Sequence, residues 1–116
     1  MGLTKSEIFS ESQNQLAVLA KVLGHPARVA ILQHLLKVNA CIGGDLVEEI
    51  GLAQPTISQH LKELKKIGII RGSIEGTSVC YCIDKAMWQE IANLFAGFFN
   101  TTPEKNSDCG TDSVCC

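Results

Sequence analysis

The chain has 116 residues, of which 46% are hydrophobic, and a formal net charge of −2. This length accommodates one small domain with a modest core. No segment approaches the roughly 18 consecutive apolar residues of a membrane span. No basic segment precedes an apolar one as in a secretory signal, so we expect a cytoplasmic protein with no membrane partner.

Two parts of the chain differ in composition. The residues from Asn100 onward are polar, contain glycine and proline, and include few large apolar groups. We therefore expect a folded domain over residues 1–99 and a flexible, cysteine-containing tail over residues 100–116.

The N-terminal third predicts two helices. Apolar residues at helical spacing predict a first helix from about Lys5 to Leu23, ended by Gly24. Pro26 suits the first turn of a second helix, because its missing N–H would have no partner there. The apolar stripe of the first helix consists of Leu16, Leu19, Ala20 and Leu23, and the buried face of the second includes Val29, Leu32 and Leu36.

The middle of the chain predicts a helix-turn-helix. A short helix over Asp45–Ile50 would end at Gly51, a residue that tolerates the left-handed conformation at a helix C-terminus. A longer helix over Gln54–Ile67 would follow, with Pro55 in its first turn. Two helices joined by so short a turn are typical of DNA-binding modules.

The hydrophobic period then changes from helical to alternating, which predicts a β-hairpin. Its strands would span Ile69–Ile74 and Thr77–Ile83, on either side of the turn-forming pair Glu75-Gly76. In the second strand, alternate residues would face opposite sides. The core-facing set would be Val79, Tyr81 and Ile83, and the opposite set Ser78, Cys80 and Cys82.

A last helix would begin after Asp84, a favourable N-cap residue. Its narrow apolar stripe consists of Trp88, Ile91, Phe95 and Phe98. Because the first helix also carries an apolar stripe, we expect the two terminal helices to form a homodimer interface. The alternative is that both helices cover the core of a monomer. The predicted fold is mainly α with a β-hairpin wing, a winged helix-turn-helix of about five helices and two strands.

The helix over Gln54–Ile67 is the predicted DNA-reading element. Residues 54–76 carry a net charge of +2, whereas residues 1–53 carry −1 and residues 77–116 carry −3. Polar side chains early in such a helix can bind base edges, with Gln59 best suited to adenine, and later lysines suit phosphates. An ordinary amphipathic surface helix is the alternative. The residues expected to bind DNA are Gln54, Thr56, Ser58, Gln59, His60, Lys62 and Lys66.

Two segments, LGHPARVAIL (Leu23–Leu32) and GDLVEEIGLAQPTISQHLKELKKIGII (Gly44–Ile70), together with the hairpin, resemble the ArsR/SmtB family of winged-helix metal-responsive repressors. The resemblance covers residues 15–98 and is most specific in QPTISQHLKEL. It implies a symmetric dimer that binds double-stranded operator DNA on an inverted repeat, with half-sites about one helical turn apart. It also implies that the wing, including Arg71 and Thr77, touches the DNA backbone or minor groove.

The ligand sites of that family are only partly present. The arsenic-type C-x-C-x-x-C pattern falls on Ile42, Gly44 and Val47, and Cys41 lies one residue away from it. We interpret Cys41 as incidental, although it could be a displaced ligand or a buried thiol. The zinc-type site on the last helix needs histidines, and no histidine follows His60.

The other cysteines are candidates for a ligand site. Thiolates select soft ions, and trivalent arsenic or antimony is satisfied by three sulfurs. We expect arsenite or antimonite to be the inducer that releases the repressor from its operator. The candidate ligands are Cys109, Cys115 and Cys116 in the tail, with Cys80 and Cys82 as second candidates.

Two other signals suit the same thiols, namely a redox or persulfide signal and a soft metal such as cadmium or lead. An enzyme is not expected, because no sequence pattern pairs a cysteine with a histidine base and an orienting carboxylate.

Overall fold

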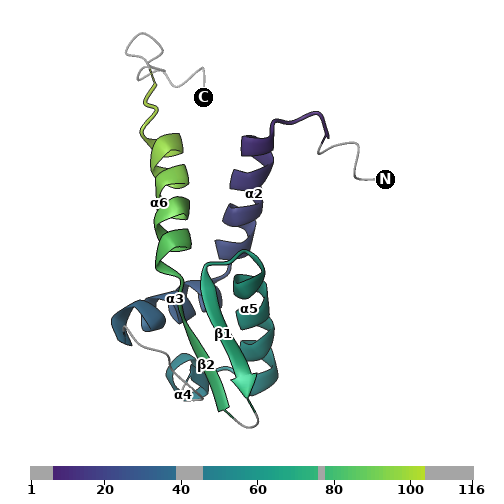
Figure 1. Cartoon of the computed structure of the whole chain (residues 1–116), viewed down its shortest axis with the longest axis vertical. Coiled ribbons are helices and arrows are strands. Elements are labelled where there is room, and N and C mark those ends of the chain that lie inside the picture. The colour runs from purple at the N-terminus through teal and green to yellow at the C-terminus, as the bar shows by residue number, and fades with distance from the viewer. Residues whose placement is uncertain (1–6, 39–45, 76–77, 104–116) are drawn as a thin grey trace, which may run out of the picture.

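The computed structural model describes residues 7–38, 46–75 and 78–103, and of residues 73–75, 78 and 79 it describes the backbone. These residues form five helices and a two-stranded antiparallel sheet, which confirms the predicted winged helix-turn-helix (Figure 1). In chain order the elements are α2 (Glu11–Leu23), α3 (Pro26–Val38), α4 (Leu46–Ile50), α5 (Gln54–Lys66), β1 (Ile70–Glu75), β2 (Ser78–Ile83) and α6 (Lys85–Phe99).

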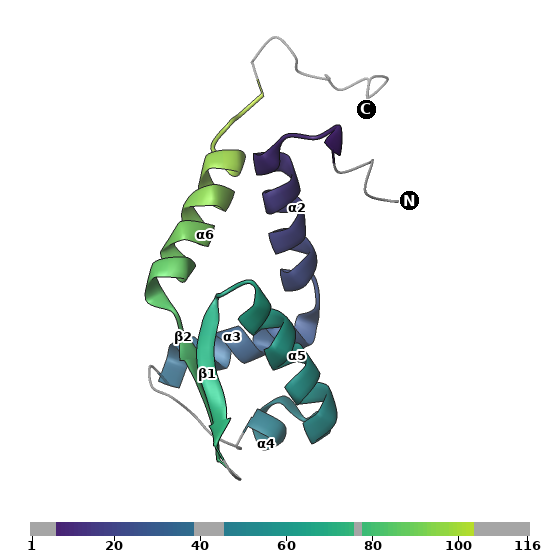
Figure 2. The same ribbon diagram turned by 45° about the vertical axis from the view of Figure 1, so that its right-hand side comes forward.

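The helices and the hairpin form a lobe from which two helices project. α3, α4, α5 and the hairpin pack together, while α2 and α6 both extend from one end of the lobe (Figures 1 and 2). Among the described residues, no single helix is long and apolar enough to cross a membrane; only α2 and α3 taken together reach that length and composition, and they are bent by 86°.

The first long helix begins later than predicted. Ser10 caps α2, because its Oγ accepts a hydrogen bond from Gln13 N at 3.1 Å and its N–H donates to Gln13 Oε1 at 2.9 Å. This reciprocal capping box satisfies backbone groups that the helix itself leaves unpaired, and it fixes the start of α2 at Glu11. The predicted start at Lys5 falls in residues 1–6, outside the described residues.

The core lies where α3, α5 and the hairpin meet. Its largest fully buried side chains are Ile31, Leu35, Ile57, Leu64, Ile69 and Ile70. The prediction for α3 was partly wrong: Leu32 is buried at 5% exposure, but Val29 and Leu36 are 42% and 44% exposed. The buried face of α3 is instead turned toward Ile31 and Leu35, which leaves Val29 and Leu36 on a second apolar face.

The hairpin joins α5 to α6. β1 and β2 pair antiparallel, with Gly72 opposite Tyr81 and Arg71 opposite Cys82. Tyr81 is 7% exposed and packs in the core, as the alternating pattern predicts. Asp84 then caps α6 by accepting a hydrogen bond from Met87 N at 3.0 Å, which confirms its predicted role.

Candidate nucleic-acid interface

Helix α5 is anchored along one side and open along the other. Ile57, Leu61 and Leu64 are at most 2% exposed and hold the helix against the core. The exposed polar residues of the helix are Gln54, Thr56, Gln59, Lys62, Lys65 and Lys66. Ser58 is half-buried, and its Oγ accepts a hydrogen bond from Gln54 Nε2 at 3.0 Å. The buried stripe thus presents a continuous polar face outward.

The N-terminal end of α5 lies near α4 and near the end of the lobe where the two strands meet their turn (Figures 1 and 2). Its N-cap residue, Ala53, has no side chain able to bind the first-turn N–H groups. Helix N-termini left without a side-chain cap favour phosphate oxygens, because N–H groups and the helix dipole point at the ligand. Both features suit contact with a nucleic-acid backbone at this end.

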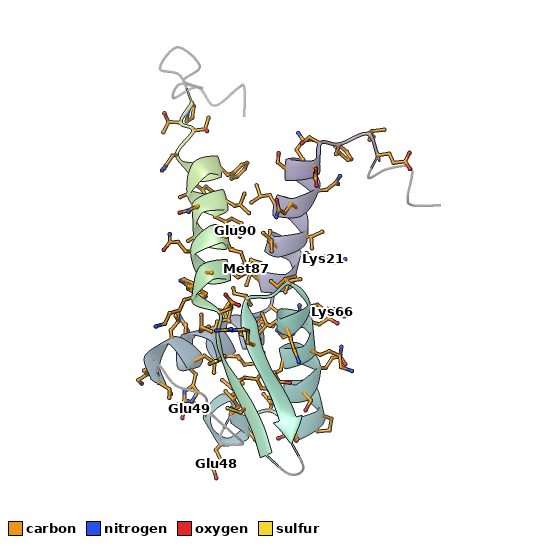
Figure 3. The ribbon with its side chains drawn as sticks, viewed as in Figure 1. Lys21, Glu48, Glu49, Lys66, Met87 and Glu90 are labelled. Atoms are coloured by element: carbon orange, nitrogen blue, oxygen red, sulfur yellow. The ribbon has the colours of Figure 1, made fainter. Side chains whose placement is uncertain are left out.

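Charge along α5 is unevenly distributed. Lys62, Lys65 and Lys66 are exposed, and Lys66 lies at the end of the helix away from α4 (Figure 3). One acidic residue, Glu63, accepts a hydrogen bond from Gln59 Nε2 at 3.2 Å and lies 3.6 Å from Lys66 Nζ. Such an exposed ion pair contributes little stability, so Gln59 and Lys66 can exchange Glu63 for another partner at small cost.

His60 does not belong to the exposed face, contrary to the prediction. Its side chain is only 7% exposed, and its Nδ1 accepts a hydrogen bond from Arg28 Nε at 3.1 Å. The ring of His25 lies against it, with 4.5 Å between ring centroids. Burial, followed by His25 and then Arg28, lowers the pKa of His60 from its ordinary value of 6.5. His60 is therefore a neutral internal residue and is unavailable to a DNA base.

Arg71 is exposed on the hairpin and forms an ion pair. It lies near the start of β1, at the end of the hairpin away from the turn, and its Nε is 3.3 Å from Asp84 Oδ2. This position separates it from the N-terminal half of α5. Thr77, the other predicted wing residue, lies outside the described residues.

The two hairpin cysteines differ in state. Cys80 is exposed and disulfide-bonded, whereas Cys82 is a half-buried free thiol. Cys82 lines an open pocket of about 870 Å³ together with Arg71 and Trp88. Cys41 and the predicted tail ligands Cys109, Cys115 and Cys116 lie outside the described residues. Within residues 7–38, 46–75 and 78–103, no three histidine, cysteine or acidic side chains gather in a way that could hold a metal ion.

An apolar surface runs from α3 to α6. Val29 and Leu36 of α3 line a groove of about 420 Å³ with Trp88 and Ile91 of α6. Further along the projecting helices, Val18, Phe98 and Phe99 are 54%, 58% and 69% exposed. Groups of large exposed apolar side chains on a small protein mark an interaction surface.

Sequence reasoning missed the partners of His60. Arg28 and His25 stand beside Pro26 at the start of α3, in a segment that the sequence marks only as a helix start. A weak signal was present, because an arginine in the first turn of an otherwise apolar helix needs an acceptor when it is half-buried. The identity of that acceptor, 32 residues away, depends on the packing of α3 against α5.

Known proteins share this arrangement. Residues 25–71 match the family model described as bacterial regulatory protein, arsR family. An uncharacterised HTH-type transcriptional regulator of Methanocaldococcus jannaschii is 36% identical over 84 residues, covering 72% of this chain and 94% of that protein. The biofilm growth-associated repressor of Xylella fastidiosa, strain Temecula1, is 30% identical over 95 residues, or 82% of each chain. The structure of reduced HlyU from Vibrio cholerae matches with a TM-score of 0.57 and 29% identity, covering 72% of this chain and 90% of that one.

Proposed function

This chain belongs to the ArsR family of bacterial regulatory proteins, and from that premise we propose how it represses transcription. It is a transcriptional repressor, not an enzyme. Two copies bind an inverted-repeat operator, each placing α5 in a major groove. The observation that carries this proposal is the polar face of α5, held outward by buried Ile57, Leu61 and Leu64.

Each residue on that face has a proposed role. Gln59 makes paired hydrogen bonds to adenine, which gives sequence preference. Gln54, Thr56 and Ser58, near the N-terminus of α5, contact base edges or sugars, and Lys62 and Lys66 neutralise phosphates. Thr77 stays in the proposed interface as a wing residue. His60 leaves it because its side chain is buried. Arg71 stays as a wing residue, because its exposed ion pair with Asp84 can be exchanged for a phosphate at small cost.

The homodimer forms through the projecting helices. Val18 on α2 and Phe98 and Phe99 on α6 are exposed, and covering them with a second copy removes apolar surface from water. A symmetric dimer also places two copies of α5 about one helical turn apart, 34–36 Å along B-DNA, as an inverted repeat requires. Operator DNA is in the cytoplasm, so we keep this as the proposed location.

The release signal is thiol chemistry at the hairpin. Cys80 and Cys82 lie two residues apart on β2, on the same side of the strand. Cys82 is a free thiol and Cys80 is disulfide-bonded, so this strand offers two sulfurs once the disulfide is reduced. Arsenite or antimonite takes three thiolates, so Cys80 and Cys82 would supply two of them and another cysteine of the chain the third. We therefore propose Cys80 and Cys82 as ligands, with the third thiolate drawn from the tail set Cys109, Cys115 and Cys116.

A redox signal is the second candidate, favoured by the disulfide itself. A dithiol reductant breaks the bond at Cys80, giving two thiols in the repressor while the reductant becomes a disulfide. A persulfide or another thiol oxidant reverses the change by taking up the two electrons. A soft metal such as cadmium would use the same reduced thiols.

Release from DNA distinguishes these signals. Fluorescence anisotropy of a labelled duplex from the DNA upstream of the coding sequence follows binding of the reduced protein during titration with arsenite, antimonite, cadmium or persulfide. We expect arsenite to release the wild type, but not Cys80→Ser, Cys82→Ser or the triple variant Cys109→Ser, Cys115→Ser, Cys116→Ser. Release lost only in the tail variant would reject the hairpin site. Release by persulfide and not by arsenite would establish the redox candidate.

A further inference from the structure

Arg28 of α3 forms an internal hydrogen bond with His60 of α5. Arg28 donates two hydrogen bonds to two different elements: Nε to Nδ1 of His60 at 3.1 Å, and Nη1 to the carbonyl oxygen of Val22 at 3.0 Å. Val22 is in the last turn of α2, and His60 is in the middle of α5. One guanidinium thus joins a projecting helix to the DNA-reading helix.

We propose that Arg28 is a positioning residue for operator recognition, which fixes the rotation of α5 through His60 and ties it to the C-terminal end of α2. This inference rests on the proposed role of α5 in DNA binding.

The contacts of α5 with DNA bases should be sensitive to rotation of the helix about its own axis, and His60 lies where it can limit that rotation. His60 lies between Gln59, on the exposed face, and Leu61, on the buried face. The apolar anchors Ile57, Leu61 and Leu64 resist withdrawal of the helix from the core, but apolar contacts are not directional. Side-chain tips lie about 5–6 Å from a helix axis, so a rotation of about 10° moves them by about 1 Å. A displacement of that size breaks hydrogen bonds to base edges.

The chemistry of the pair enforces one arrangement. Arg28 is permanently charged and can only donate, so the bond requires an unprotonated Nδ1 on His60. Burial and the neighbouring His25 and Arg28 lower the pKa of His60, which keeps the ring neutral and the acceptor available. A hydrogen bond from a charged donor at a half-buried site is stronger than a neutral one, and its planar donor group restricts direction as well as distance.

The hydrogen bond from Arg28 to Val22 connects α5 to α2 as well as to α3. In the proposed dimer, α2 packs against the second copy, so the carbonyl of Val22 moves with the dimer interface. Arg28 holds that carbonyl and His60 at once, which couples the spacing of the two subunits to the orientation of each reading helix.

Two conservative substitutions test the proposal. His60→Asn places an amide oxygen where Nδ1 accepts the bond, whereas His60→Leu keeps the bulk and removes the acceptor. We measure the dissociation constants of each variant for the upstream duplex and for a scrambled duplex of the same length, with circular dichroism to confirm folding. We expect His60→Leu and Arg28→Gln to lose about tenfold or more in affinity for the upstream duplex, with scrambled-duplex affinity unchanged. His60→Asn should stay within about threefold of the wild type.

The outcomes separate this inference from the proposed function. If the wild type prefers the upstream duplex and His60→Leu and Arg28→Gln keep that preference, the positioning role is overturned while the repressor proposal stands. If the wild type binds both duplexes equally, the repressor proposal itself fails. If Arg28→Gln does not fold, the comparison of His60→Asn with His60→Leu still tests the proposal. An equal loss of affinity for the upstream duplex in these two variants would overturn the role of the Nδ1 acceptor.

Discussion

Gly68 lies directly against Met87: a Cβ added to Gly68 would be 3.3 Å from Met87 Cε. Gly68 connects α5 to β1 with a φ of 82°, in the left-handed region, and its N–H donates to Lys65 O at 2.9 Å. The junction between the reading helix and the wing therefore depends on a residue without a side chain, packed under the first turns of α6.

Gly68→Ala should destabilise the fold. The left-handed backbone costs a residue with a Cβ about 1–2 kcal/mol, and the contact with Met87 adds to that cost. We expect the melting temperature to fall by at least about 4 °C, since 1 kcal/mol shifts a domain of this size by about 4–8 °C. Gly51→Ala is the matched control, because Gly51 has φ 86° but nothing within 4 Å of its added Cβ. Equal losses in the two variants would show that Met87 contributes nothing.

Gly72→Ala should disrupt the wing. An added Cβ at Gly72 would overlap the carbonyl oxygen of Cys80 and come within 2.6 Å of Tyr81 Cδ1. Since Tyr81 is buried in the core, neither neighbour can move away cheaply. We expect a loss of more than about 2 kcal/mol in unfolding free energy, measured by urea denaturation. A variant as stable as the wild type would contradict the strand register of the hairpin.

The elements were largely predictable from the sequence because local chemistry sets them. Gly51 ended the short helix, Asp84 capped the last helix, and the change of period marked the hairpin. The start of α2 was not predicted, because Ser10 and Gln13 form a capping box inside a segment whose apolar pattern extends further back.

Tertiary packing determined the burial of several residues that the hydrophobic pattern of the sequence could not assign. Val29 and Leu36 share the helical period with Leu32, so periodicity alone assigns them to the core; the structure exposes them on the groove beside α6. His60 is polar and adjacent to Gln59, so it reads as part of the exposed face. Its burial depends on Arg28 and His25, which only the fold brings to it.

The stability of the protein should fall in mild acid because of His60. Its pKa is lowered in the folded state, so the unfolded chain binds more protons as the pH falls below the ordinary value of 6.5. The contribution of His60 is fully present above pH 6.5 and is lost as the pH falls through the folded-state pKa. For one proton the slope is at most about 1.4 kcal/mol per pH unit. Urea denaturation between pH 7.5 and 5 gives the unfolding free energy at each pH, and this free energy should fall less steeply with decreasing pH in His60→Asn than in the wild type. Equal pH dependence in the two proteins would contradict the role of His60.

Lys62 should contribute to the salt dependence of DNA binding. Each phosphate that a lysine neutralises adds close to one unit to the slope of log affinity against log salt. Lys62→Ala should reduce that slope by about one. The control is Lys21→Ala, since Lys21 is exposed on the projecting helix α2 and not on α5 (Figure 3). A smaller slope in the control, or an unchanged slope in Lys62→Ala, would place the DNA elsewhere.

Sequence preference at α5 tests the account most directly. The measurement is the ratio of dissociation constants for the upstream duplex and a scrambled duplex at physiological salt, for the wild type and for Gln59→Ala. We predict that the wild type prefers the upstream duplex by about 10³-fold or more, and that Gln59→Ala reduces this ratio by about tenfold. A wild-type ratio near one, or a ratio that Gln59→Ala leaves unchanged, would contradict the assignment of α5 as the element that reads DNA.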